Sequence, residues 1–330
     1  MKNLKDTRRI GLGCMNLSHA YGPRPSEADA VTFLNEALDL GYDHLDSAAL
    51  YGFGNNESLL GKAVMHRRDE FYLASKCGMF KDETGQRSID GHPDVIKQTC
   101  EDALRRLGTE VIDLYYLHRW DKRIPIEDSV GAMADLVQQG KVRHLGLSEV
   151  SADTLRKAHR EHPITALQTE YSLWSRNPEI AVLRACEELD ITFVAFSPLA
   201  RGYLGAELTD PNQLPDTDIR RKMPRFSDEH YPKNLALLDP VKAIAADLGI
   251  TPAQLTLAWV LNQTPTMVAI PGTTQLNHAR DNLAAADIEL SDAVLDELDQ
   301  TINLDTVSGP RYGKATLAEI DTELFDSERD

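Results

Sequence analysis

The chain has 330 residues, of which 42% are hydrophobic and 26% charged. These values are typical of soluble globular proteins and exclude the disordered and membrane classes. Asp and Glu number 52 against 35 Lys and Arg, which gives a formal net charge of -17. We therefore expect neither nucleic acid nor a membrane surface as the main partner, and we interpret the acidity as a contribution to solubility.

The four cysteines, Cys14, Cys77, Cys100 and Cys186, form no C-x-x-C pair and have no histidine at metal-ligand spacing beside them. We expect reduced thiols, no metal site and a cytoplasmic protein. Residues 1–9 are polar and lack the apolar core of a signal peptide.

Short apolar segments alternate with longer segments of helical period from Ile10 to Pro271. This alternation is typical of βα units around a parallel sheet. Strands are expected at residues 10–13, 44–47, 71–76, 112–118, 144–148, 166–170, 192–197 and 268–271. Helices are expected at residues 26–40, 56–65, 93–107, 127–139, 152–162, 180–189, 236–248 and 276–286, with an additional one at 252–262. Helix ends are marked by N-cap candidates Ser26, Ser151 and Ser291 and by C-cap candidates Gly41 and Gly140.

Eight strands fit an α/β protein of the (β/α)8 TIM barrel type, which we expect to form a single domain over about residues 9–301. A doubly wound sheet would require a G-x-G-x-x-G turn after the first strand, where this chain has GLGCM. Residues 201–233 are rich in Pro, Asp and Arg and lack a clear period, so we expect either a lid or a disordered loop. The tail, residues 302–330, is only weakly patterned.

Four polar residues lie at or just beyond the ends of three successive predicted strands: Asp46, Tyr51, Lys76 and His118. In a barrel, the C-terminal ends of the strands meet at one face and carry the catalytic groups. A lysine close to a tyrosine is expected to lower the phenol's pKa from its ordinary value of about 10. Asp46 would keep Lys76 charged, and His118 would share the substrate oxygen with Tyr51. Each residue alone has a simpler structural explanation, but the joint pattern favours proton delivery to a carbonyl oxygen.

The sequence blocks around these residues resemble the aldo-keto reductases in order along the chain. They are GLGCM (11–15), GYDHLDSAALYG (41–52), ASKCG (74–78), LYYLHRWD (114–121), LGLSE (145–149), LQTEYSLWSR (167–176), AFSPLARGYL (195–204) and IPGTTQLNHARDNL (270–283). The resemblance implies a barrel without a Rossmann domain that binds NADPH or NADH across the strand ends. It also implies hydride transfer between the nicotinamide and a carbonyl carbon.

The resemblance implies a role for each matching residue. Tyr51 is expected to be the general acid, Lys76 and Asp46 its tuning pair, and His118 the residue that orients the carbonyl. The expected cofactor contacts are Gly13, Met15, Ser148, Glu149, Gln168, Phe196, Ser197, Leu199, Arg201, Gly202, Gly272, Thr273, Thr274, Gln275, His278, Asp281 and Asn282. Within this set, Ser148 and Gln168 match the positions that hold the nicotinamide carboxamide, and Phe196 matches the position that stacks on the nicotinamide ring. Residues 197–202 match the loop that wraps the pyrophosphate, where the Arg201 guanidinium and backbone N–H groups suit phosphate oxygens. Substrate-wall candidates are Tyr21, Phe53, Trp120 and Trp174.

Three departures from the family pattern affect these expectations. Glu149 stands where asparagine is common and is expected to accept a hydrogen bond from the carboxamide. Thr274 and Gln275 stand where the family often has basic residues near the 2′-phosphate, which weakens the preference for NADPH. NADPH remains the first expectation, with NADH or dual use as the alternative, and Arg280 would compensate if its side chain faces inward. The short segment before Ile10 predicts a shortened or absent N-terminal hairpin.

Two other functions are open to the sequence. A metal-dependent hydrolase would use His118, Asp46 and Glu170, but the chain has no H-x-H cluster. A regulatory subunit of the same fold would bind cofactor without turnover. Substrate choice is expected to lie in loops 79–91, 119–124, 174–177 and 201–233 and in the tail. The substrate is expected to be a small or medium carbonyl compound or its alcohol, and the oligomeric state is left open.

Overall fold

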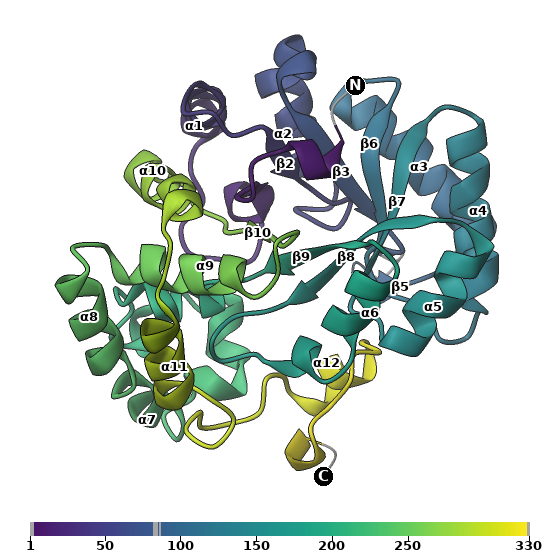
Figure 1. Ribbon diagram of the computed structural model, residues 1–330. Helices are drawn as coiled ribbons and strands as arrows, with labels where there is room; N and C mark the ends of the chain where they lie inside the picture. Colours follow the sequence, from purple (N-terminus) through teal and green to yellow (C-terminus); the bar gives the residue numbers. More distant parts are fainter. Residues whose placement is uncertain (1–2, 82–84, 86, 329–330) are drawn as a thin grey trace.

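The structure is a computed structural model that describes residues 3–81, 85 and 87–328. Eight parallel strands form a barrel in the order β1-β2-β3-β6-β7-β8-β9-β10 (Figure 1). The bounds are β1 Leu12–Gly13, β2 His44–Asp46, β3 Tyr72–Cys77, β6 Ile112–Leu117, β7 Val142–Ser148, β8 Ile164–Glu170, β9 Thr192–Phe196 and β10 Val268–Ile270. A parallel bridge between Ile10 and Ala269 closes the ring beside β1. The TIM barrel prediction is confirmed, and each predicted strand differs by at most a few residues.

Helices surround the barrel in Figure 1. They are α1 Glu27–Asp39, α2 Asn55–Val64, α3 Pro93–Leu107, α4 Ile126–Gln138, α5 Ala152–Glu161, α6 Val182–Glu188, α7 Tyr231–Leu235, α8 Leu238–Asp247, α9 Pro252–Asn262, α10 Leu276–Ala284, α11 Asp292–Thr301 and α12 Lys314–Ala318. The side chains of Ser26, Ser151 and Ser291 accept hydrogen bonds from the backbone three residues later, so the three predicted N-caps are confirmed. Gly41 and Gly140 follow α1 and α4 with φ of 102° and 74°, as the C-terminal signals predicted.

The barrel interior is filled by alternate side chains of the strands, because successive residues of a strand point to opposite faces. Tyr72, Tyr116 and Val194 belong to this buried cluster. Gly146 makes room for it: a Cβ atom there would lie 2.4 Å from the Tyr116 ring. Leu4, in the 3-10 turn Leu4–Asp6, is 1% exposed and packs into the same cluster. The described residues before β1 therefore form no hairpin, and Leu4 fills the barrel floor instead.

Three regions differ from the sequence expectation. A short antiparallel hairpin, β4 Met79–Lys81 and β5 Arg87–Ile89, follows β3 and was not predicted; residues 82–84 and 86 of this loop lie outside the described residues. The segment 201–233 folds into successive 3-10 turns that end in α7. The tail carries α12, and Arg311 and Tyr312 are among its buried residues. The expectation of weak patterning therefore underestimated its order.

Within the described part of the chain, no single helix has the length and apolarity to cross a membrane. One pair bent by 90°, Tyr231–Asp247 with Pro252–Asn262, passes these criteria only when taken together. Cys14, Cys77, Cys100 and Cys186 are buried free thiols.

Candidate active site

Asp46, Lys76 and Tyr51 form a buried chain of contacts at the C-terminal ends of β2 and β3. Lys76 Nζ donates to an Asp46 carboxylate oxygen, to the Ser47 carbonyl at 2.8 Å and to the Tyr51 hydroxyl at 3.2 Å. The lysine is fully buried and the aspartate is 1% exposed. His118 lies just past β6 with its ring 5.8 Å from that of Tyr51, at an interplanar angle of 86°. The structure thus brings all four predicted catalytic residues together.

The charge states of these groups follow from burial and from their partners. Burial opposes the charge on Lys76, but Asp46 and Tyr51 outweigh it and raise the lysine pKa. Burial raises the pKa of Tyr51, and the nearby Lys76 offsets only part of that effect. Lys76 lowers the phenol's pKa as expected, but burial, which the sequence did not reveal, outweighs it, so the net shift is upward. Burial, aided by Arg119, holds the pKa of His118 well below its ordinary value, so its ring is neutral at neutral pH.

Ser148 and Gln168 lie side by side at the ends of β7 and β8, where the register pairs them directly. Gln168 Nε2 donates to the second Asp46 oxygen at 2.8 Å, which ties this pair to the catalytic chain. The Ser148 hydroxyl accepts a hydrogen bond from Arg119 at 3.2 Å. Both side chains are almost fully buried. An amide group that reached this point would meet a hydroxyl and a carboxamide held in fixed positions.

The loop after β9 has an unusual backbone. Ser197, Ala200 and Arg201 have φ of 49°, 47° and 60°, and Gly202 follows with φ of 93°. Such conformations are strained for residues other than glycine and cluster at ligand sites. Consecutive residues that pass from right-handed to left-handed conformation also turn their N–H groups into a concavity suited to anions. The loop therefore fits the pyrophosphate position expected for 197–202, and Phe196 and Leu199 remain partly exposed beside it.

Glu149 and Arg201 are engaged differently from the sequence expectation. Glu149 Oε1 accepts from Arg311 Nη2 at 2.5 Å and from the Glu170 backbone N–H at 2.9 Å. Arg201 Nη2 lies 2.6 Å from Glu170 Oε2 and 2.9 Å from the Tyr312 hydroxyl. Two tail residues therefore fix these side chains: Arg311 binds Glu149, and Tyr312 binds Arg201. The carboxylate and the guanidinium were expected to face the cofactor, but each is committed to a buried ion pair.

Glu170 also bears on the hydrolase alternative. Its carboxylate lies 2.6 Å from Arg201 and accepts a hydrogen bond from the Tyr312 hydroxyl at 2.6 Å. The charges of Arg201 and Arg311, together with that hydrogen bond, lower the pKa of Glu170 to about 2 despite its burial. It contacts neither His118 nor Asp46. Among the described residues, no group of three His, Cys, Asp or Glu side chains is placed to hold a metal ion.

The residues expected around the adenosine lie in the loop between β10 and α10 and within α10 itself. Gly13 and Gly272 approach each other so closely that a Cβ on Gly272 would lie 3.0 Å from the Gly13 carbonyl oxygen. Thr273 and Asn282 are buried, whereas Gly272, Thr274, Gln275 and Arg280 are exposed and Asp281 is intermediate. His278 Nε2 lies 3.2 Å from Glu207, so α10 contacts the loop after β9. A dinucleotide that followed these loops would cross the strand ends from Ser148 to Asn282.

Of the four substrate-wall candidates, Tyr21, Phe53 and Trp120 are at least partly exposed, whereas Trp174 is buried. Phe53, 45% exposed, meets His19 edge to face at 6.1 Å, and His19 in turn stacks beside Tyr51 at 6.3 Å. Trp120 is partly exposed and donates to the Ile124 carbonyl at 2.8 Å. Trp174 is instead a core residue stacked on Tyr203 at 4.3 Å. The Tyr21 hydroxyl accepts from Arg201 at 3.2 Å. Met15 packs against the small buried cluster that contains Tyr51.

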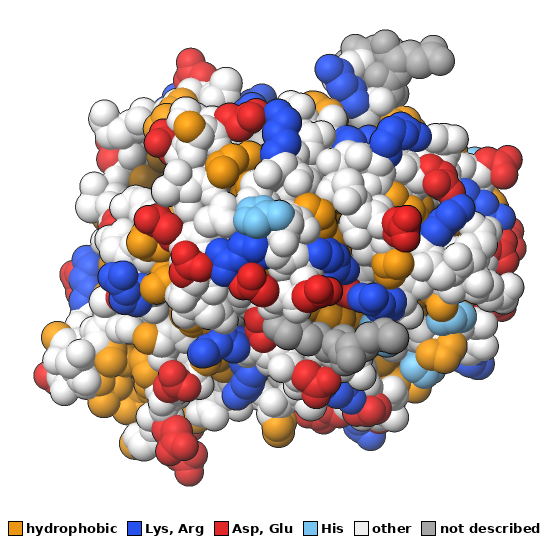
Figure 2. All heavy atoms as spheres, turned by 90° about the horizontal axis from the view of Figure 1, so that it is seen from above, with side chains coloured by type: hydrophobic (Ala, Val, Ile, Leu, Met, Phe, Trp, Pro, Cys, Tyr) orange, Lys and Arg blue, Asp and Glu red, His pale blue; other side chains and the backbone are white. Residues whose placement is uncertain are grey.

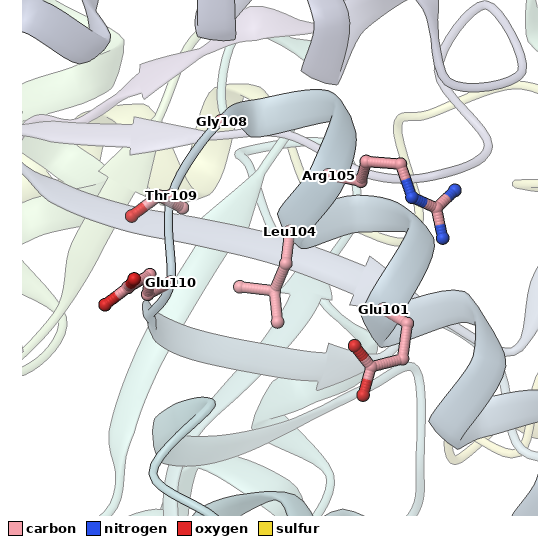
Figure 3. A pocket seen from close by; sticks show the side chains of 6 residues that line it. All are labelled: Glu101, Leu104, Arg105, Gly108, Thr109 and Glu110. Carbon is pink, nitrogen blue, oxygen red and sulfur yellow. The ribbon is translucent and has the colours of Figure 1, made fainter.

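A shallow hollow elsewhere on the surface carries no part of this site. Glu101, Leu104, Arg105, Gly108, Thr109 and Glu110 line it (Figure 3). These residues lie where α3 ends and the chain enters β6, which is the opposite end of the strands from Tyr51.

Four residues of the site received no individual role from the sequence: His19, Arg119, Arg311 and Tyr312. Arg119 was part of a matching block but received no role, although its position directly after His118 was visible. Arg311 and Tyr312 follow Gly309-Pro310 in a segment without period. The contact of Arg311 with Glu149 joins residues 162 positions apart in the sequence, and that of Tyr312 with Glu170 joins residues 142 positions apart. Together, the barrel and these groups define a (β/α)8 protein with an acid-base site at the C-terminal ends of its strands.

Comparisons with known proteins identify the family. The model of the aldo/keto reductase family matches residues 9–303. Aldo-keto reductase yakc, NADP(+), of Schizosaccharomyces pombe is 42% identical over 92% of this chain and 91% of its own length. Probable aldo-keto reductase 1 of Glycine max is 39% identical over 93% of this chain and 89% of its own. The chain belongs to the aldo/keto reductase family.

Solved structures agree with this assignment. The glycerol dehydrogenase AKR11B4 from Gluconobacter oxydans superposes with a TM-score of 0.83 at 28% identity, covering 92% of this chain and 94% of that one. An aldo-keto reductase from Klebsiella pneumoniae, solved with NADP and acetate, has a TM-score of 0.70 at 28% identity, with the same coverage. The resemblance noted in the sequence is thereby confirmed, and the protein is an oxidoreductase of this family.

Proposed function

We propose that the protein is an NADPH-dependent reductase of aldehydes or ketones, which also runs in reverse from the alcohol, with Tyr51 as the proton donor. The observation that carries the proposal is the buried contact of Lys76 with both Asp46 and the Tyr51 hydroxyl. The names of the relatives support the cofactor, since yakc is named for NADP(+) and the Klebsiella protein was solved with NADP or NADPH.

The cofactor fits the residues present on two observations. Ser148 and Gln168 are positioned to hold a carboxamide, and the left-handed run from Ala200 to Gly202 can cradle phosphate oxygens. When bound, the nicotinamide supplies or accepts the hydride. Thr273, Thr274, Gln275 and Asn282 would hold the adenosine end, and the exposed Arg280 is the cation nearest in sequence for a 2′-phosphate.

The chain's own residues account for the proton. Tyr51, with its pKa raised by burial, stays protonated near neutral pH and can donate to a carbonyl oxygen. Lys76, kept charged by Asp46, stabilises the tyrosinate that remains after the transfer. A neutral His118 can donate an N–H hydrogen bond to the same oxygen without competing as an acid. Burial of this set excludes water from the developing charge.

The remaining partner and location assignments are proposals of the same kind. On the face shown in Figure 2, basic and acidic side chains are interspersed and form no continuous positive patch. Together with the net charge of -17, this favours a small-molecule substrate over nucleic acid or a membrane. Four buried free thiols suit the reducing cytoplasm. We also infer that residues 9–301 act as one barrel domain.

Oxidation of NADPH in the presence of a panel of aldehydes tests the proposal. We expect turnover with at least one aldehyde and its loss in Tyr51→Phe. Tight NADPH binding without turnover on any aldehyde or alcohol would overturn the enzyme assignment and favour a regulatory subunit.

A further inference from the structure

Arg119 is a charged residue of the active site that the proposed mechanism does not use. It follows His118 directly, and its Nη1 donates to the His118 carbonyl at 2.6 Å and to the Ser148 hydroxyl at 3.2 Å. The residue is partly exposed. Its Nε and Nη2 make no hydrogen bond to a described residue, and it has no ion pair within the described chain. Within the part of the chain that the structure describes, the edge formed by Nε and Nη2 of this partly exposed guanidinium therefore has no partner, and it lies beside His118 and Ser148.

This lack of a counter-ion sets Arg119 apart from its neighbours. Several other arginines at this end of the barrel are paired with carboxylates. Arg201 lies 2.6 Å from Glu170, Arg311 2.5 Å from Glu149, Arg87 2.5 Å from Glu319, and Arg123 2.7 Å from Asp121. Lys76 is likewise neutralised by Asp46. Of the cations named here, Arg119 is the one without a carboxylate partner among the described residues, although the chain carries a net charge of -17.

The charged groups that most affect the pKa of His118 are cationic or can become so. After burial, the contributions that lower the pKa of this histidine come from Arg119, Lys76, Arg87 and His19, all of them cationic or able to become so. Arg119 also favours the ionised form of Tyr51. Arg119 therefore places a positive charge beside His118 and Tyr51, and a guanidinium can bind a carboxylate through two parallel hydrogen bonds.

A purely structural role leaves part of this arrangement unexplained. Orienting the Ser148 hydroxyl and the His118 carbonyl requires only Nη1. A neutral side chain could perform that single task at a lower cost in free energy, because an unpaired charge that is partly removed from water is destabilising. The free edge of the guanidinium, formed by Nε and Nη2, has the geometry that carboxylates use.

We propose that Arg119 selects substrates in which the carbonyl group is accompanied by a carboxylate, and that the free edge of its guanidinium binds that carboxylate. The inference rests on the proposed function and names the substrate class of the same site. Arg119 is then a specificity residue: the hydride and proton transfers are those proposed above, and the carboxylate fixes the orientation of the carbonyl toward Tyr51 and His118.

The test uses two aldehydes of nearly the same shape, 4-carboxybenzaldehyde and its neutral amide, 4-formylbenzamide. The measured quantity is the ratio of kcat/KM for the acid to that for the amide, with NADPH saturating. We expect a ratio well above one for the unaltered protein, falling roughly 10- to 100-fold in Arg119→Gln, the range for loss of a hydrogen bond to a charged group. Arg119→Lys should retain part of the preference, and added salt should weaken it.

The matched control is Arg105→Gln. Arg105 is 72% exposed at the opposite end of the strands, so this variant removes the same charge without touching the site. We expect an unchanged ratio. An equal loss with both aldehydes in Arg119→Gln, or a weaker Kd for NADPH with the ratio unchanged, would overturn the inference and assign Arg119 to positioning Ser148. No turnover of either aldehyde, together with none across the wider panel, would instead refute the proposed function.

Discussion

The pair formed by Arg311 and Glu149 allows a sharp prediction for stability. Neither side chain has any exposure, and Nη2 of the arginine lies 2.5 Å from the carboxylate. Arg311→Met would remove the cation and leave Glu149 with the Glu170 backbone N–H at 2.9 Å and the Thr322 hydroxyl at 3.5 Å. Breaking a buried ion pair by removing one partner costs about 3–5 kcal/mol, because the other charge remains in a medium that solvates it poorly.

That free energy converts into a measurable temperature shift. At about 2.1 cal/mol/K per residue, a chain of 330 residues has an unfolding entropy of roughly 0.7 kcal/mol/K. A loss of about 3–5 kcal/mol therefore lowers Tm by roughly 4–7 °C. Urea unfolding followed by tryptophan fluorescence gives the free energy directly, and calorimetry gives Tm.

A double-mutant cycle identifies the cause. Glu149→Gln combined with Arg311→Met removes both charges, so the double variant should be more stable than Arg311→Met alone. If Arg311→Met lies within about 1 kcal/mol of the unaltered protein, or if the two substitutions are additive, the pair does not hold the tail in the way the contacts indicate. We also expect weaker NADPH binding in Arg311→Met, because Glu149 adjoins Ser148.

Four further outcomes are expected. Tyr51→Phe should lower kcat by at least about 100-fold while the Kd for NADPH, measured by fluorescence quenching, stays the same, because only the proton donor is lost; near-full turnover would contradict the mechanism. Gly146→Ala should lower the free energy of unfolding in urea by about 1–3 kcal/mol, because the added Cβ would lie 2.4 Å from the Tyr116 ring. The control Gly131→Ala in α4, whose Cβ would meet only the flexible Glu161 side chain at 3.7 Å, should not lower it. Burial lowers the pKa of His44 and His118. Below about pH 6.5 the unfolded chain therefore binds more protons than the folded one, and the protein should become less stable as the pH is lowered. A urea midpoint that stays constant between pH 7 and 5 would show that these rings become charged freely in the folded protein. Finally, Kd should be lower for NADPH than for NADH, and equal values would mean that the exposed Arg280 does not reach the 2′-phosphate.

Much of the fold was predictable because its signals are local. The alternation of apolar runs with helical periods, the serine N-caps and the glycine C-terminal signals each involve residues within a few positions of one another. The hairpin β4-β5 was missed because each strand has three residues, too few to show a period. The order in segment 201–233 was missed because 3-10 turns have no amphipathic repeat.

The candidate site divides in the same way. The register of Asp46, Lys76 and His118 relative to the strand ends was readable, since the ends of parallel strands meet at one face of a barrel. The net pKa of Tyr51 was not, because it depends on how deeply the folded chain buries the phenol. Trp174 could equally have been a pocket wall or a core residue until Tyr203 was found stacked on it at 4.3 Å.

The sequence by itself therefore determined the barrel, the family and which four polar residues would meet at the strand ends, because each depends on local periodicity or on motif position. Only the tertiary structure decided which charges are free to act on a ligand. Glu149 is paired with Arg311 from the tail, and Arg201 is paired with Glu170 and donates to Tyr312 from the tail. Arg119, beside His118, has no carboxylate partner among the described residues. Ion pairing depends on distances between segments far apart in the chain, and those distances exist only after folding.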